Sequence, residues 1–390
     1  MRIARLASAY LASRPLLTAL NATMLALGVA TITFLLLVTT QAEDRLTRDA
    51  KPVDLVVGAK GSPLQLILST VFHADVPTGN IDLAQAQAIR RNPMIASAIP
   101  LALGDSFRGH RIVGTEASYL DLYGAKLAQG ALFAGEMEAV VGSEVARRHG
   151  LAVGATLTGA HGLAAAGPAH EGHPYRVVGI LAPSGTVVDR LVVTPVESVW
   201  HVHEEHAPPR PEITALLVRY ATPLAAAMLP RAINANTAMQ AASPAYESAR
   251  LLDLAGVGVD TLRWFAVVLM ASAALSLFVA LTSALQERRY DLALLRTLGA
   301  RPASLAALTL VEGVTLLVAG VILGLALGHG AAHALGLWLA GAGSWPLTGL
   351  VWVDGEAALV ATVLATGALT CLVPAVQAYS SDPASLLAKR

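Results

Sequence analysis

Four long apolar segments constrain the fold of this chain more than any other feature of its sequence. They cover residues 16–38, 264–285, 303–328 and 357–376. The first is an uncharged run of twenty-three residues, which as a helix would be roughly 34 Å long and would cross the hydrocarbon core of a bilayer. A cleaved signal peptide is the alternative, but the run exceeds the usual length of a signal peptide's apolar region and lacks a clear small-x-small cleavage site before Glu43. The sequence therefore predicts four transmembrane helices.

A long polar section separates the first apolar segment from the second. Residues 45–260 contain no run long enough to span a bilayer, and their length suits one or two compact domains. The flanks at 43–51 and 246–260 are expected to continue the first and second membrane helices as stalks. With 55% hydrophobic and 14% charged residues, the chain is expected to be a membrane protein with one large soluble part.

The pattern of apolar residues and turn signals predicts an α+β fold for the polar section. Two similar sets of elements are separated by a long insertion. The expected elements are strands at 53–57, 95–103 and 111–113, a helix at 82–91 with Asp82 as its N-cap, and then a strand at 213–220, a helix at 223–234 and a strand at 237–241. This order predicts a split βαβ subdomain, with a mainly-β subdomain inserted at about residues 115–205.

Basic residues beside the apolar segments predict the topology. Arg2, Arg5 and Arg14 precede the first segment, and Lys and Arg close to membrane spans remain on the cytoplasmic side. A second basic cluster lies between the second and third segments and consists of Arg288, Arg289, Arg296 and Arg301. Both termini are therefore expected in the cytoplasm, and residues 45–260 on the opposite, periplasmic side of the inner membrane.

The basic cluster also predicts a short amphipathic helix. Leu292, Leu295 and Leu298 recur at helical spacing between polar residues. Gly299 and Pro302 then provide a stop signal. The helix is expected to lie at the inner surface of the membrane.

Several stretches resemble a known family of membrane proteins. The runs RRYDLALLRTLGARPASL and VPAVQAYSSDPASLLAKR, with the apolar helix through Glu312, resemble the permease domain of FtsX-type and MacB-type ABC transporters. Within the polar section, the runs YLDLYGAKLAQGALF, EAVVGSEVARRHGLAVGATL and YRVVGILAPSG resemble the periplasmic core domain of MacB-type permeases. The resemblance implies a first membrane helix in residues 1–44, a periplasmic core domain in 45–260 and an FtsX-like permease domain in 261–390.

The resemblance implies a permease subunit of the mechanotransmission type in a bacterial ABC transporter. Such a subunit works as a dimer, with a second copy or a paralogue, and docks through a coupling helix at about 287–298 on a separate ATPase that carries the ATP and Mg²⁺. Movement of its periplasmic domain serves export or efflux, extraction or envelope signalling, with room for a periplasmic or outer-membrane partner. The candidate coupling residues are Arg288, Arg289, Asp291, Leu292, Leu295, Arg296 and Leu298.

The chain itself is expected to be non-catalytic and to carry no cofactor for ATP hydrolysis. The run Gly58-Ala59-Lys60-Gly61-Ser62 is not a Walker A loop, because its Lys precedes the second glycine and the glycines are too close. A net charge of zero argues against a nucleic-acid partner. The single cysteine, Cys371, lies in an apolar segment and excludes an internal disulfide.

Polar and small residues in the third apolar segment raise two further expectations. Glu312 is costly at membrane depth, so it either faces a polar partner or lies closer to the surface than the segment suggests. Gly320, Gly324 and Gly328 recur every four residues, which allows another helix to approach closely. That helix belongs either to the same subunit or to a second copy.

A histidine cluster in the polar section is a candidate metal site. His201, His203 and His206 could present imidazoles to one Zn²⁺, with His170 and His173 as supplementary ligands. The alternative is a solvated loop whose histidines never converge, because a helix and a strand would each bring only two of the first three to one face. The sequence therefore leaves two other functions open beside the permease: a zinc-binding export or sensing component, and an envelope scaffold without an ATPase.

Overall fold

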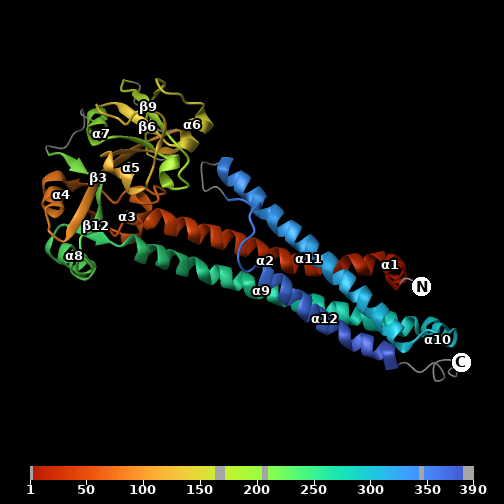
Figure 1. Ribbon diagram of the computed structural model, residues 1–390. Coiled ribbons are helices and arrows are strands. Elements are labelled where there is room, and N and C mark those ends of the chain that lie inside the picture. Colours follow the sequence, from red (N-terminus) through yellow and green to blue (C-terminus); the bar gives the residue numbers. More distant parts are fainter. Residues whose placement is uncertain (1–2, 163–171, 204–209, 342–346, 381–390) are drawn as a thin grey trace. The chain divides into compact units, whose positions relative to one another are not determined.

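The structure is a computed structural model, and it describes residues 3–162, 172–203, 210–341 and 347–380. The chain divides into two compact units (Figure 1). Unit 1 comprises residues 1–41 and 255–390, and unit 2 comprises residues 42–254. Two helices, α2 and α9, each contribute residues to both units.

Unit 1 is helical. Its helices are α1 (Ile3–Ala12), α2 (Pro15–Ala50), α9 (Pro244–Glu287), α10 (Arg289–Thr297), α11 (Pro302–Gly341) and α12 (Glu356–Ser380). Four of these, α2, α9, α11 and α12, are long and apolar enough to cross a membrane, which confirms the predicted number of spans. The expected stalk segments lie inside α2 and α9, which are 36 and 44 residues long.

The third span is longer than predicted. We expected it to end at Gly328, but α11 continues to Gly341. Residues 331–340 are mostly alanine and leucine, which favour a helix strongly enough to outweigh the cost of Gly328 and Gly330. Gly328 is therefore a packing position and not a helix end.

The glycine ladder of α11 packs against α2 of the same chain. A Cβ at Gly320 would lie 2.6 Å from Leu25, and one at Gly328 would lie 2.7 Å from Thr33. At Gly324 the Cβ would meet the Ala26 carbonyl oxygen at 2.8 Å. These contacts are far closer than real Cβ atoms allow, so the ladder serves helix packing within the subunit, the first of the two alternatives.

We expect Gly324→Ala to destabilise unit 1 and Gly330→Ala not to. Both changes bring the same gain in helix propensity, but a Cβ at Gly330 has no atom within 4 Å. Overpacking at Gly324 should cost on the order of 1–3 kcal/mol. Thermal unfolding of the purified protein in detergent measures the difference, and equal melting temperatures would show that α2 and α11 do not meet at Gly324.

Unit 2 is built on one mixed sheet. Its strands are β1 (Leu55–Ala59), β3 (Ile95–Phe107), β4 (His110–Thr115), β5 (Leu127–Gly130), β6 (Glu138–Val141), β7 (Thr156–Leu157), β8 (Ala160–His161), β9 (Tyr175–Leu181), β10 (Val192–Pro195), β12 (Ala215–Tyr220) and β13 (Met239–Ala242). The order is β13-β1-β12-β3-β4-β10-β6-β9-β5, with β8 on β3 and β7 on β9. The pairs β4/β10 and β6/β9 are parallel and the others are antiparallel.

Short helices cover this sheet. They are α3 (Pro63–Thr70), α4 (Leu83–Arg90), α5 (Ser118–Leu122), α6 (Ser143–His149), α7 (Val196–Val202), α8 (Pro223–Asn236) and the 3₁₀ helix η1 (Val187–Arg190). A separate small ladder pairs β2 (Ile81–Asp82) with β11 (Glu212–Ile213). Asp82 caps α4 as predicted, because its Oδ1 accepts from the N–H groups of Ala84 and Gln85.

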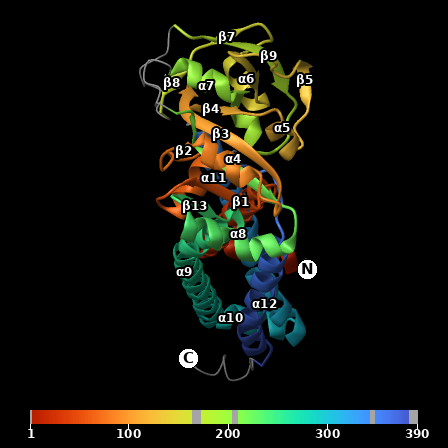
Figure 2. The ribbon, with the colours of Figure 1, turned by 90° about the vertical axis from the view of Figure 1, so that its left-hand side faces the viewer.

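The insertion differs from the prediction. The two halves of the split subdomain meet as expected, because β12 lies between β1 and β3. The inserted part is mixed α/β and not mainly β, since it contributes α5, α6 and α7 as well as strands. It also extends the same sheet through β3 (Figure 2), while burying a separate apolar core around Ile112, Val141 and Val177.

Candidate functional site

Helix α10 has one face inside the helical unit and one face outside. Leu292 is 5% exposed, and with Leu295 it packs against Leu285, Leu305 and Ala378. This is a correction, because we expected both leucines to be available to an ATPase. The outward face instead carries Tyr290, Asp291, Leu294 and Leu298. Leu298, the C-cap residue, is 77% exposed, and its role in coupling stays a prediction.

Arg288, at the N-cap of α10, is used inside unit 1. Its Nη1 atom lies 3.0 Å from Glu312 Oε1 on α11, and both side chains are largely buried. The guanidinium also stacks over the ring of Tyr10 at 3.7 Å. Glu312 thus has the polar partner that its depth requires, and Arg288 is not free to contact another protein. Arg14 forms a second ion pair, with Glu287 at the end of α9, so charged contacts lie on both α9 and α10 where the two helices join.

The remaining predicted coupling residues fall on α10. Arg296 lies in the last turn of α10 and is partly buried, whereas Asp291 lies in the first turn and is exposed. The side chain of Arg289 lies outside the described part of the chain.

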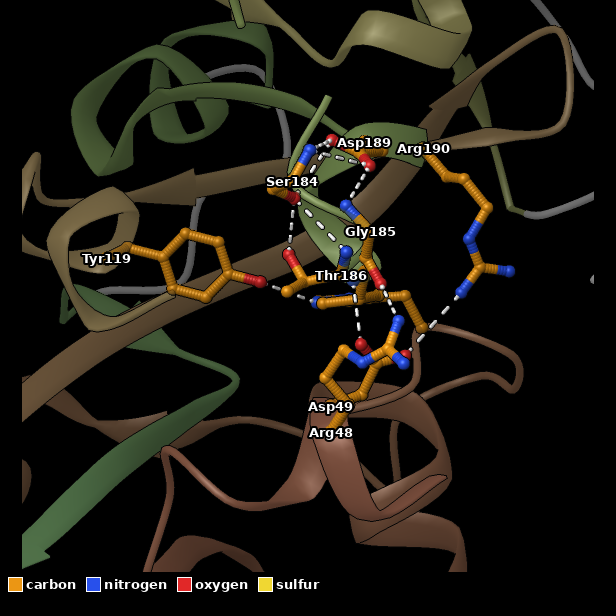
Figure 3. Close-up of polar contacts among 10 residues, drawn as sticks. Arg48, Asp49, Tyr119, Ser184, Gly185, Thr186, Asp189 and Arg190 are labelled. Carbon is orange, nitrogen blue, oxygen red and sulfur yellow. Dashed lines mark hydrogen bonds and ion pairs between the residues drawn. The ribbon is translucent and has the colours of Figure 1, made fainter. Parts of the chain in front are cut away.

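A second cluster of polar contacts lies in unit 2, where α2 ends (Figure 3). Asp49, in the last turn of α2, is only 2% exposed. Its Oδ1 accepts a hydrogen bond of 2.8 Å from the N–H of Val187, and its Oδ2 lies 3.9 Å from the Arg190 guanidinium. The neighbouring Arg48 donates to the Gly185 carbonyl at 3.2 Å. The end of α2 is therefore bonded to residues 185–190 of the inserted part.

The segment bonded to α2 is itself tightly ordered. Asp189 accepts hydrogen bonds from the N–H groups of Ser184 and Gly185 and from the Ser184 hydroxyl, at 2.7 to 3.1 Å (Figure 3). Gly185 has φ +72°, a left-handed conformation that favours glycine. This segment, residues 184–190, is therefore held by its own hydrogen bonds as well as by those to α2.

Buried histidines and tyrosines surround this segment. His73 and the Tyr119 hydroxyl share a hydrogen bond of 3.0 Å, and burial lowers the pKa of His73 well below its usual value. His110 donates from Nδ1 to the Arg190 carbonyl at 3.1 Å. Burial lowers its pKa to about 4, although that hydrogen bond opposes the shift. Both rings are therefore neutral in the folded protein at neutral pH.

The predicted histidine site is not formed as expected. His201 lies in α7 and contacts the ring of His173, with centroids 5.1 Å apart. His203, just after α7, turns instead to His161 and Asp105. Two residues separated by one position diverge on a helix, so His201 and His203 do not share a ligand position. His170 and His206 lie outside the described residues.

The three side chains around His203 form the one metal-like group found in the described part of the chain. The ligand atoms of Asp105, His161 and His203 all lie within 4.8 Å of one another. A hydrogen bond that His203 donates to the Asp105 carboxylate raises the pKa of His203. The sequence could not predict this group, because Asp105 is remote from both histidines along the chain.

Comparison with known proteins gives the family. The family model of the MacB-like periplasmic core domain matches residues 18–236, and that of the FtsX-like permease C-terminal domain matches residues 263–383. The chain belongs to the MacB and FtsX family of ABC transporter permeases. This membership agrees with the four apolar helices and the mixed-sheet unit of the structure.

Two solved structures similar to this chain are single regions of larger proteins. The periplasmic region of MacB from Actinobacillus actinomycetemcomitans is 14% identical, with 53% of this chain and 95% of that chain covered and a TM-score of 0.36. The extracellular domain of the noncanonic ABC-type transporter YknZ from Gram-positive bacteria is 12% identical, with 48% and 98% covered and a TM-score of 0.32. No curated protein matches the permease.

The hydrogen bonds between the end of α2 and segment 184–190 of this permease were not predicted from the sequence. Arg48 and Asp49 look like ordinary charges after a membrane span, and Ser184-Gly185-Thr186 looks like a turn that precedes a 3₁₀ helix. Each local signal is visible in the sequence. The pairing of Asp49 with Val187 is not, since the two residues lie 138 positions apart.

We expect the permease's unit 2 to lose stability as the pH falls below about 6.5. The pKa values of His73 and His110 are lower in the folded state than the unfolded value, so the unfolded chain binds more protons below pH 6.5. Each histidine contributes a slope of about 1.4 kcal/mol per pH unit, which for His110 ends near pH 4. Unfolding followed by the fluorescence of Trp200, with the other tryptophans replaced by Phe, measures the slope.

The variant His110→Gln tests the origin of that slope. Its amide can still donate to the Arg190 carbonyl but does not titrate in this range. Between pH 6.5 and 4, the free energy of unfolding of this variant should fall less steeply with pH, by the contribution of one histidine. At pH 7.5 its stability should equal that of the wild type. A slope identical to that of the wild type would show that His110 does not titrate on unfolding.

Proposed function

We propose that this permease couples ATP hydrolysis by a separate ABC ATPase, on one side of the inner membrane, to displacement of unit 2 on the other side. The observation that carries the proposal is the continuity of α2 and α9, each an unbroken helix with residues in both units. A helix satisfies its own backbone hydrogen bonds and moves as a stiff body. A shift of its cytoplasmic part is therefore passed along its axis.

The proposal assigns docking of the ATPase to one site and transmission of the movement to another. Helix α10 is the docking element, and its exposed Tyr290, Leu294 and Leu298 offer apolar contacts beside Asp291. The hydrogen bond from Val187 to Asp49 then passes the movement of α2 to segment 184–190. The chain supplies the movement, and its ATPase partner supplies ATP, Mg²⁺ and hydrolysis.

The orientation and assembly of the permease follow from the arginine bias and the family resemblance. Both termini and α10 lie in the cytoplasm, and unit 2 lies in the periplasm. The permease acts as a dimer, with a second copy or a paralogue. The displacement of unit 2 drives export, extraction of an envelope molecule or signalling to a periplasmic or outer-membrane partner.

We expect changes on the outward face of α10 to release the ATPase. Leu294, which is 47% exposed, can become Glu without disturbing the buried Leu292. In Leu294→Glu and Asp291→Arg, less ATPase should co-purify from membranes in mild detergent, because an apolar contact or a charge of the docking face is lost. The partner is recognised by mass spectrometry through its Walker A and B motifs, and insertion of the permease should be unchanged.

The control for docking is Leu132→Glu, the same change at an exposed leucine of unit 2. It should retain the ATPase at the wild-type level. Full retention of the ATPase by both α10 variants would contradict the docking role of this face. A wild-type protein from which no ATPase co-purifies would favour the scaffold function instead.

We expect Asp49→Ala to separate ATPase binding from movement of unit 2. The change removes the acceptor of the Val187 N–H but leaves α10 intact, so the ATPase should still bind and hydrolyse ATP. Hydrogen exchange of segment 184–190, measured with and without ATP, should then no longer respond to the nucleotide.

The matched control is Asp82→Ala. Asp82 also accepts backbone N–H groups in unit 2, at the start of α4, so its loss costs about 1 kcal/mol of helix capping. The nucleotide response of segment 184–190 should survive this change. If Asp49→Ala retains the response as well, the movement does not pass through Asp49.

A further inference from the structure

Three side chains from separate elements of unit 2 converge on one point. Asp105 Oδ1 lies 3.4 Å from His161 Nδ1 and 3.5 Å from His203 Nε2. Asp105 lies in β3, His161 in β8, and His203 directly follows α7. The two histidine rings are 5.2 Å apart between centroids.

Backbone contacts hold these side chains in place. Asp105 and His161 are direct partners in the antiparallel pairing of β3 with β8, and the Gly162 N–H donates to the Gly104 carbonyl at 2.9 Å beside them. The His203 N–H donates to the Trp200 carbonyl at 3.0 Å, which ends α7. The geometry thus rests on regular backbone pairing, as a binding site requires.

The hydrogen bond of His203 determines which of its nitrogens faces Asp105. Nδ1 lies 2.8 Å from the Val199 carbonyl oxygen, which can only accept, so Nδ1 carries the proton. In the neutral ring, Nε2 is therefore a lone pair directed at a carboxylate oxygen. A proton on Nε2 joins the two groups as an ion pair, and a bound metal ion is the other cation that can join them. A histidine that donates its other nitrogen to a backbone carbonyl is the usual arrangement at a metal.

Two of the three ligand separations fit a tetrahedral metal better than a short hydrogen-bonded ion pair, and the third lies within 4.8 Å. Ligands bound at 2.0–2.1 Å to Zn²⁺ lie about 3.3–3.4 Å from each other, close to the measured 3.4 and 3.5 Å. Charge-assisted N–H···O bonds are shorter, at about 2.7–2.9 Å. Two imidazoles and one carboxylate are also ligands that Zn²⁺ accepts.

The competing role of Asp105 is to balance a buried arginine. Arg111 in β4 is 2% exposed, and burial lowers its pKa to about 10 while Asp105 opposes that shift. That role concerns one positive charge and does not explain why two imidazole nitrogens approach the same oxygen. One divalent ion would bind all three groups at once.

We propose that Asp105, His161 and His203 bind a divalent transition-metal ion, with Zn²⁺ as the best match. The three side chains leave a fourth tetrahedral position for water or another group. Bound metal ties β8 and the end of α7 to β3. The site differs from the one that the spacing of His201, His203 and His206 suggested, since it shares only His203 with it. It is independent of the proposed coupling to an ATPase.

The full-length protein, purified in mild detergent and treated with a chelator, is titrated with Zn²⁺ and with Co²⁺. We expect micromolar or tighter Zn²⁺ binding in competition with a chromogenic chelator, and a visible Co²⁺ spectrum typical of four-coordinate geometry. His161→Ala and His203→Ala should each weaken Zn²⁺ binding by about tenfold or more and abolish the Co²⁺ spectrum. His161 is half exposed, so its replacement leaves the core intact.

The control is His201→Ala, which removes a histidine from the same helix end but on the side of His173. It should leave Zn²⁺ affinity and the Co²⁺ spectrum unchanged. The proposal is overturned if the wild type binds no Zn²⁺ at micromolar concentration, or if His161→Ala and His203→Ala bind as well as the wild type. Loss of binding in His201→Ala with retention in His161→Ala would also overturn it, in favour of the His173 and His201 pair.

Discussion

A bilayer offers no hydrogen-bond partner to the peptide backbone, and the structure of this permease depends on that constraint. The chain can cross the hydrocarbon only as helices that satisfy their own N–H and C=O groups. In α2 and α9 the same internal bonding continues beyond the apolar residues, for 36 and 44 residues in all. The helical solution to this constraint therefore also provides the two unbroken helices on which the proposed coupling relies.

The low polarity of a bilayer also requires that a buried charge in unit 1 has a partner of opposite charge. Glu312 on α11 is only 8% exposed in its side chain, and removal of either member of its pair with Arg288 would leave a buried charge without compensation. The pair, with Tyr10 beside it, joins the N-cap residue of α10 to α11. The basic cluster therefore has one arginine directed into unit 1 and a separate outward face on which Leu294 and Leu298 are exposed.

Sequence reasoning reached the elements of this permease but not the contacts between them. Hydropathy predicts the four spans because the bilayer leaves one solution, and Asp82 is recognisable as a cap because capping is local. The end of α11 was misplaced, since glycines that look like breakers are packing positions. The junction of Asp49 with Val187 and the approach of Asp105 to His161 depend on strand pairing across long stretches of chain, which no local pattern encodes.

The two polar sites of unit 2 lie at opposite ends of one continuous segment. Segment 184–190, bonded to Asp49, leads through η1 into β10, and β10 runs directly into α7, which ends at His203. Between these ends β10 is held by β4 on one side and β6 on the other. In the proposed coupling, α2 would displace the near end of this segment, and a metal ion at His203 would fasten its far end to β3. A movement of α2 would then act on the sheet of the inserted part and not on α7 alone.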